Sequence, residues 1–138
     1  MLVAHTTRPI AFPRPAGNHI GYDMVRAREL SSTTVLVTAV GEVDAASAAD
    51  LSEGIARHLS GYRQLVLDLS RLVFFAAAGY SVLHRVHSGC ALAGIGWVLV
   101  PGPEVARLLR VCDPDGILPT APNIVSAVAK LARAHTAA

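Results

Sequence analysis

Three side chains of kinds that bind transition metals follow one another along a predicted helix. His84, His87 and Cys90 are spaced at i, i+3 and i+6, and zinc sites are commonly built from histidine and cysteine. Cys90 falls on the apolar face of this helix, whereas His84 points away from that face. Because the three side chains do not converge on one point and no fourth ligand is evident, we predict no metal site. We interpret the histidines as surface or boundary residues and Cys90 as a core thiol.

The cysteines Cys90 and Cys112 are also a candidate redox pair. Each ends a predicted helix that returns to the start of a strand, so we expect both at the same end of the fold. A disulfide needs Cα atoms within about 7 Å of each other, and buried cysteines on apolar helix faces are usually inert. We therefore favour two reduced packing residues and keep a redox switch as the alternative.

The spacing of the polar residues does not indicate catalysis. The sequence shows no Ser-His-Asp, Cys-His or paired-carboxylate arrangement. The glycines at positions 94 and 96 precede a predicted strand, whereas a dinucleotide-binding fingerprint opens a helix. We predict a protein that is not an enzyme and carries no cofactor.

Several polar residues stand near the ends of predicted strands. Asp44 precedes a helical pattern, and we expect its carboxylate to cap that helix by accepting hydrogen bonds from amides of the first turn. Asp68 and Ser70 lie at the carboxyl end of a central strand, where they could hydrogen-bond the neighbouring turn. Ser81 lies one turn into the next predicted helix, where a serine is usually exposed and solvated.

Alternating strands and helices position these residues. Apolar runs rich in β-branched residues predict buried strands, and apolar residues at helical spacing predict helices. The predicted strands cover residues 24–30, 34–40, 65–69 and 95–100, with a short final strand at 117–118. The first predicted helix follows Asp44, and three further helices are predicted at residues 79–93, 103–112 and 123–134.

This order indicates an α/β fold with a mixed, largely parallel sheet of roughly four to five strands and about four helices. Because crossover connections are right-handed, the turns at residues 41–44 and 75–79 should share one end of the sheet. In open α/β sheets, functional residues gather at that end.

Composition and length limit the possible functions. The chain has 138 residues, which suits one domain, and 52% of them are hydrophobic while 16% are charged. The net charge of +2 is scattered, so we predict no nucleic-acid binding. No run reaches the roughly 20 apolar residues of a membrane helix, so we predict no membrane insertion. Because the first residues lack the pattern of a signal peptide, we expect the protein to be cytoplasmic.

Two further features are compositional. Residues 1–21 contain several prolines and no sustained periodicity, so we interpret them as a loose extension and residues 22–138 as the folded domain. Lys130 is the only lysine and alanine is frequent, a bias that indicates a GC-rich, actinobacterial genome.

Three segments, in order, resemble the STAS domain of bacterial anti-sigma factor antagonists. They are VLVTAVGEVD at 35–44, VLDLSRLVFFAAAGYSVL at 66–83 and GWVLVPGPEVARLLRVCDPDGI at 96–117. The resemblance covers residues 24–134 and implies the STAS fold. It also implies a surface that binds a protein partner, formed by Glu42, Asp44, Asp68, Ser70, Ala76, Ala77, Ala78, Gly79 and Ser81.

The chain departs from the family pattern at the phosphorylation site. The family segment D-S-S-G falls on Ala76, Ala77, Ala78 and Gly79, and its phosphorylated serine falls on Ala78. Alanine has no hydroxyl group, so that phosphorylation cannot occur here. The resemblance implies either a protein locked in its partner-binding form or a diverged domain that no longer binds the kinase. Ser81 is a candidate substitute phosphosite.

The function implied by the resemblance is regulatory. The protein would bind an anti-sigma factor of the histidine-kinase-like ATPase fold and thereby free a sigma factor for transcription, with the nucleotide carried by the partner. Two alternatives remain, a STAS subunit of a lipid-transport ATPase complex and a STAS domain that senses a nucleotide or another small molecule. The sequence leaves open the sigma factor and the oligomeric state.

Overall fold

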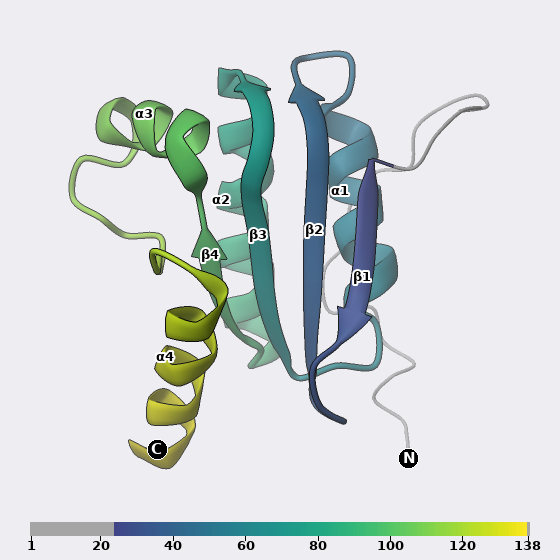
Figure 1. Cartoon of the computed structure of the whole chain (residues 1–138), viewed down its shortest axis with the longest axis vertical. Coiled ribbons are helices and arrows are strands. Elements are labelled where there is room, and N and C mark those ends of the chain that lie inside the picture. The colour runs from purple at the N-terminus through teal and green to yellow at the C-terminus, as the bar shows by residue number, and fades with distance from the viewer. Residues whose placement is uncertain (1–23, 138) are drawn as a thin grey trace.

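The computed structural model describes residues 24–137 and shows an α/β fold. Its sheet has four strands in the order β1-β2-β3-β4 (Figure 1). The strands are β1 (Val25–Glu29), β2 (Thr34–Val43), β3 (Gln64–Phe75) and β4 (Gly96–Val100). β1 pairs antiparallel with β2, whereas β2 pairs parallel with β3 and β3 with β4. The predicted mixed, largely parallel sheet is confirmed.

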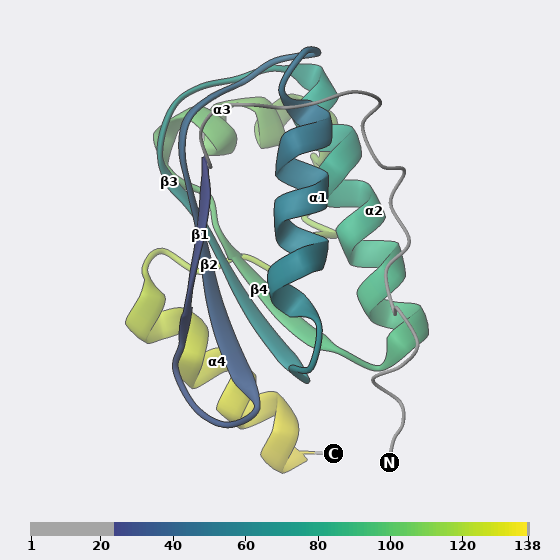
Figure 2. The same ribbon diagram turned by 90° about the vertical axis from the view of Figure 1, so that its right-hand side faces the viewer.

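Helices cover the two faces of the sheet unequally. In the described part of the chain they are α1 (Ala48–Leu59), α2 (Ala77–Ala93), α3 (Gly102–Cys112) and α4 (Ile124–Ala137). Figures 1 and 2 show α1 and α2 side by side on one face, with α4 low on the opposite face. The short helix α3 stays beside the carboxyl ends of β3 and β4 (Figure 1).

Two apolar cores hold these layers together. The larger core lies under α1 and α2 and includes Val35 and Leu65, while the smaller core lies under α4 and includes Leu36 and Val66. Successive residues of a strand point to opposite faces, so both core layers draw on the same strands. This explains why β2 and β3 begin as continuous apolar runs instead of alternating with polar residues.

The structure corrects one predicted strand. Ile117 and Leu118 form no strand, because the Asp113 carboxylate accepts hydrogen bonds from their amides at 2.9 and 3.0 Å. A single parallel bridge between Leu99 and Thr120 lies a little further along the chain. The predicted final strand is therefore wrong, and the sheet has four strands within residues 24–137.

Two sequence expectations concern the chain outside the sheet. The proposed loose extension at residues 1–21 lies outside the described residues. Within residues 24–137, no helix combines the length and the apolar character needed to span a bilayer.

Candidate functional site

Strands β2 and β3 continue past their neighbours and form a two-stranded ribbon. β1 pairs with β2 only as far as Ala39, and β4 pairs with β3 only as far as Asp68. Residues 40–43 and 71–75, which we call the β2–β3 ribbon, pair with each other beyond the ends of β1 and β4. At the base of the ribbon, the Val40 amide donates a 3.0 Å hydrogen bond to the Met24 carbonyl. Figure 2 shows the ribbon bending over the N-terminal ends of α1 and α2. Sequence patterns placed the end of β3 at residue 69 and therefore missed most of the ribbon.

The β2–β3 ribbon exposes apolar side chains beside α2. Val73 is 67% exposed and Phe74 is 48% exposed, whereas Phe75 points into the core. The Phe75 ring lies against Gly79, where an added Cβ atom would come within 2.4 Å of a ring carbon. The glycine therefore lets the first turn of α2 pack directly on the end of the ribbon.

The first turn of α2 has no side-chain cap. Ala76 occupies the N-cap position with extended backbone angles, φ −92° and ψ 174°, and accepts a 2.8 Å hydrogen bond from the Gly79 amide through its carbonyl oxygen. Its own amide donates to the Val43 carbonyl at 2.8 Å, which joins the end of β2 to the start of α2. The expected proximity of the two turns is confirmed.

Asp44 does not cap α1 as the sequence predicted. Its Oδ1 atom accepts hydrogen bonds from the amides of Ala46 and Ser47 at 3.0 and 2.9 Å, and from the Ser47 hydroxyl at 3.0 Å. These residues form a turn before α1, which begins at Ala48. The hydrogen bonds from Ser47 lower the pKa of Asp44 below its usual value. Oδ2 has no partner among residues 24–137 and faces solvent.

The structure brings together most, but not all, of the predicted partner-binding residues. Glu42 is exposed and pairs in register with Phe74, so it lies next to the start of α2. We call the group at this point the α2-end surface, formed by Glu42, Asp44, Val73, Phe74, Ala76, Ala77, Ala78, Gly79 and Ser81, of which Gly79 is buried.

Asp68 and Ser70 lie apart from the α2-end surface. Asp68 is buried on the sheet face that it shares with Val66, opposite to α1 and α2. Its Oδ1 atom accepts hydrogen bonds from the Ser70 amide and hydroxyl at 3.0 and 2.6 Å. The backbone of Ser70 in turn packs against Gly102 at the start of α3. These two residues shape the junction of β3 with α3.

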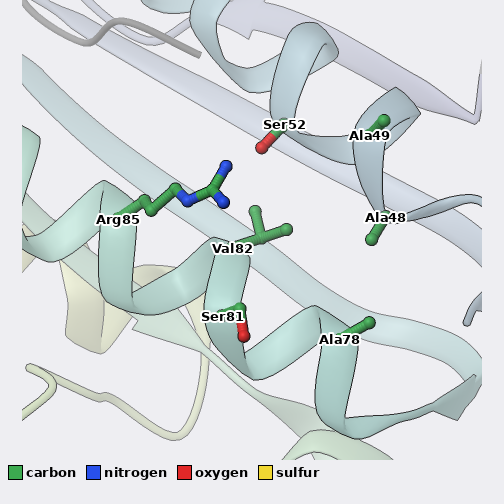
Figure 3. Close-up of a pocket in the computed structure, with 7 residues that line it drawn as sticks. All are labelled: Ala48, Ala49, Ser52, Ala78, Ser81, Val82 and Arg85. Atoms are coloured by element: carbon green, nitrogen blue, oxygen red, sulfur yellow. The ribbon is translucent and has the colours of Figure 1, made fainter. Parts of the chain in front are cut away.

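A pocket of about 320 Å³ opens between α1 and α2, next to the first turn of α2 (Figure 3). It is lined by Ala48, Ala49 and Ser52 from α1 and by Ala78, Ser81, Val82 and Arg85 from α2. Sequence analysis singled out Ala78 and Ser81 but missed Ser52 and Arg85. The spacing of Ala78, Ser81 and Arg85 at i, i+3 and i+7 is a sequence signal that they share a helix face.

The histidines of α2 contact aromatic side chains. His87 Nδ1 accepts a 3.2 Å hydrogen bond from Trp97 Nε1, and the His84 ring lies 6.3 Å from the Tyr80 ring, measured between centroids. No cluster of metal-binding side chains occurs within the described residues.

The two cysteines are free thiols at opposite ends of the fold. The carbonyl of buried Cys90 accepts a hydrogen bond from Ile95, close to the start of β4. Cys112 ends α3, which remains at the carboxyl end of the strands (Figures 1 and 2). The expectation that both cysteines lie at one end is wrong, because α3 does not run back along the sheet. Burial raises the pKa of Cys90 to about 12.

The family model of the STAS domain matches residues 25–127. Osmosensory protein A of Mycobacterium tuberculosis is 35% identical to this chain over 126 residues, which is 88% of the chain and 80% of the relative. These two matches confirm the family that the three sequence segments indicated.

Two solved structures share the fold. An anti-sigma factor antagonist from Mycobacterium paratuberculosis has a TM-score of 0.66 at 23% identity, covering 77% of this chain and 91% of that protein. The unphosphorylated form of the anti-sigma factor antagonist SpoIIAA has a TM-score of 0.62 at 15% identity, covering 78% of this chain and 95% of that protein.

Proposed function

Because this chain belongs to the STAS domain family, we propose that it acts as an anti-sigma factor antagonist. It binds an anti-sigma factor of the histidine-kinase-like ATPase fold and so releases a sigma factor for transcription. The observation that carries this proposal is the uncharged, uncapped first turn of α2, which lies beside exposed Val73 and Phe74. The structural likeness to antagonists supports the same role.

The α2-end surface combines apolar and acidic contacts that suit a protein partner. Val73, Phe74 and the methyl groups of Ala77 and Ala78 offer apolar area, which drives association when it is buried. Exposed Glu42 and the free Oδ2 atom of Asp44 offer acceptors for arginine or lysine at the rim of the interface. The partner we expect therefore carries an apolar centre and basic residues at its edge.

The alanine at position 78 makes this surface insensitive to phosphorylation at that position. A phosphate adds about −1.5 to −2 charges and is stabilised at a helix N-terminus. With a methyl group at Ala78, the first turn of α2 stays neutral and keeps its apolar contacts. The protein is then constitutively active as an antagonist, and its abundance or another signal must set its output.

The direct test is binding of the full chain to each anti-sigma factor of its own organism, measured by calorimetry with ATP present. Ala78→Glu places a carboxylate on the α2-end surface, and we expect it to weaken binding at least about tenfold, equivalent to about 1.4 kcal/mol. Ala129→Glu is the matched control, because Ala129 is exposed on α4, away from this surface. Equal affinities for the two variants would overturn the proposed surface.

Mass spectrometry of the same mixtures tests whether the protein is phosphorylated at any residue. An unchanged mass after incubation with the bound anti-sigma factor and ATP supports an antagonist that phosphorylation does not inactivate. A gain of one phosphate would show that another hydroxyl has replaced the family position, with Ser81 as the first candidate. If no anti-sigma factor binds, the proposed function fails.

A second candidate function is small-molecule sensing within the same regulatory family. Two observations favour it, the pocket between α1 and α2 and the name of the relative, Osmosensory protein A. The pocket directly adjoins Ala78 (Figure 3), so a bound ligand would change the surface proposed to contact the partner.

A further inference from the structure

The pocket between α1 and α2 contains a buried hydroxyl group. Ser52 is 2% exposed, and its Oγ atom has no hydrogen-bond partner within residues 24–137. Leaving a buried polar group unpaired is costly, so such groups are normally satisfied by protein or by bound molecules. Figure 3 shows the Ser52 oxygen directed into the space between the two helices.

A cation lies opposite this hydroxyl group. Arg85 extends from α2 toward Ser52 on α1 (Figure 3), and it has no ion-pair partner in the described part of the chain. Ser81, one turn earlier on α2, lines the same pocket, but its oxygen is directed away from Ser52 (Figure 3). A guanidinium opposite a hydroxyl donor matches the acceptor oxygens of a carboxylate or a phosphate.

The rest of the pocket is apolar. Three alanine methyl groups and the Val82 side chain form the remaining wall. A volume of about 320 Å³ is at the lower end of the range for small-molecule sites. The pocket therefore suits a small molecule with a compact apolar body and one anionic group.

We propose that the α1–α2 pocket binds a small organic anion, with its carboxylate or phosphate held by Arg85 and Ser52. The apolar part of the ligand lies against the alanine methyl groups and Val82. Ser52 supplies a hydrogen-bond donor that no residue of the described part of the chain uses, and Arg85 supplies the charge.

A ligand in this pocket would regulate partner binding, a consequence that rests on the proposed function. Ala78 forms part of the pocket wall and of the α2-end surface. Arg85 lies seven residues, about two helical turns, beyond Ala78 on α2, so the bound anionic group lies away from the helix N-terminus. The apolar part of the ligand would instead lie against Ala78 and thereby change the shape of the α2-end surface.

Nuclear magnetic resonance titrations of the labelled full chain test the binding site. The probes are phenyl phosphate and benzoate, with benzyl alcohol as the uncharged analogue, each raised to about 10 mM, well above a millimolar Kd. We expect one or both anions to shift the amide signals of the pocket residues more than benzyl alcohol does. No shift from either anion, or equal binding of the alcohol, would overturn the proposal.

Two variants locate the ligand. Arg85→Gln should weaken anion binding about tenfold or more, whereas Arg110→Gln, which changes an exposed arginine of α3 outside the pocket, should leave binding unchanged. Ser52→Ala should weaken binding several-fold and yet raise the thermal midpoint of the free protein, because it removes an unpaired buried hydroxyl. Equal losses in the two arginine variants, or unchanged binding in Ser52→Ala, would contradict the site.

The regulatory consequence is measured separately. With an anti-sigma factor that binds the chain, the probe anion should lower the apparent affinity in the wild type but not in Arg85→Gln. If the chain binds the anion but no anti-sigma factor, the proposed ligand site is supported and only the proposed function is refuted. Anion binding with unchanged partner affinity would refute the regulatory link.

Discussion

Asp44 stabilises the turn before α1 and does not cap the helix itself. One carboxylate oxygen organises the turn that carries the chain from β2 to α1, and the other oxygen faces solvent. A residue with this division can stabilise the turn and contact a partner at the same time. The family role and the local structural role are therefore compatible in one side chain.

Replacing Asp44 tests its structural contribution. The hydrogen bonds from Ser47 lower the folded-state pKa below the usual 3.8, so the charged form contributes stability above that usual value. This contribution is lost as pH falls through the lowered folded-state pKa. Asp44→Ala should therefore destabilise the protein at pH 7, and the difference from wild type should shrink as the pH falls below the usual pKa of 3.8 and through the lowered folded-state pKa.

Urea unfolding at several pH values measures this difference. Asp115→Ala is the control, because Asp115 is exposed in a turn and makes no hydrogen bond within residues 24–137. It should cost little stability at any pH. A deficit for Asp44→Ala that stays constant down to low pH would contradict the assigned role of the charge.

Gly102 is a second residue whose type is required by its surroundings. An added Cβ atom would lie 2.4 Å from the Ser70 Cα atom, and the backbone has φ +73°. Gly94 has a similar φ of +71° but nothing within 4 Å of the added atom. The two glycines thus separate the cost of backbone strain from the cost of a clash.

Comparing Gly102→Ala with Gly94→Ala should show this separation. Gly94→Ala should cost about 1–2 kcal/mol for the left-handed backbone. Gly102→Ala should cost about 1–3 kcal/mol more, because the clash is with backbone that cannot easily move. The free energy of unfolding in urea measures both, and equal costs would show that Ser70 gives way without penalty.

Among the elements, α2 is central to the proposed function because its first turn packs against the β2–β3 ribbon. The helix begins without a side-chain cap, although Ala76 already has the extended backbone of an N-cap residue. Packing of Gly79 on Phe75 and the hydrogen bond from Ala76 to Val43 hold this turn instead. Tertiary contacts here replace a local signal that most helices use.

Restoring the cap should stabilise α2. In Ala76→Ser the hydroxyl can accept a hydrogen bond from an amide of the first turn, and we expect a gain of about 1 kcal/mol. Ala77→Ser is the matched control, because that residue lies inside the helix, where serine does not cap. Thermal or urea unfolding measures the stability of both variants. If Ala76→Ser is no more stable than Ala77→Ser, the amides of the first turn do not need a side-chain cap.

For the whole molecule, the two helical layers and the position of α3 separate the cysteines. Cys90 is fully buried with a pKa near 12, and Cys112 is partly exposed at the other end of the fold. A thiolate is the reactive form of cysteine. We therefore expect them to behave as one inert and one accessible thiol.

Titration with a thiol reagent at pH 8 should detect one reactive cysteine in the native protein and both after unfolding. Cys112→Ser should abolish the native reaction, and Cys90→Ala should leave it in place. Mild oxidation should produce no intrachain disulfide. Two fast-reacting thiols in the native state, or an internal disulfide, would restore the redox hypothesis.

The sequence by itself determined the family, the order of the elements and the alanine at position 78. Strands such as β2 are readable because continuous β-branched runs suit burial on both faces. The motif around Ala78 is readable because residue identity alone excludes a phosphate ester there. These features depend on local pattern and chemistry, which are present in the linear chain.

The tertiary structure alone decided the β2–β3 ribbon, the absence of a strand at Ile117 and Leu118, and the pocket between α1 and α2. β3 extends to Phe75 because α2 packs on its far end. No strand forms at Ile117 and Leu118 because their amides donate hydrogen bonds to the Asp113 carboxylate. The sequence does not distinguish Ser52 from an exposed helical serine, whereas the structure shows its hydroxyl group buried between α1 and α2. Each depends on contacts between residues far apart in the sequence, whose side chains meet only when the sheet and helices have packed.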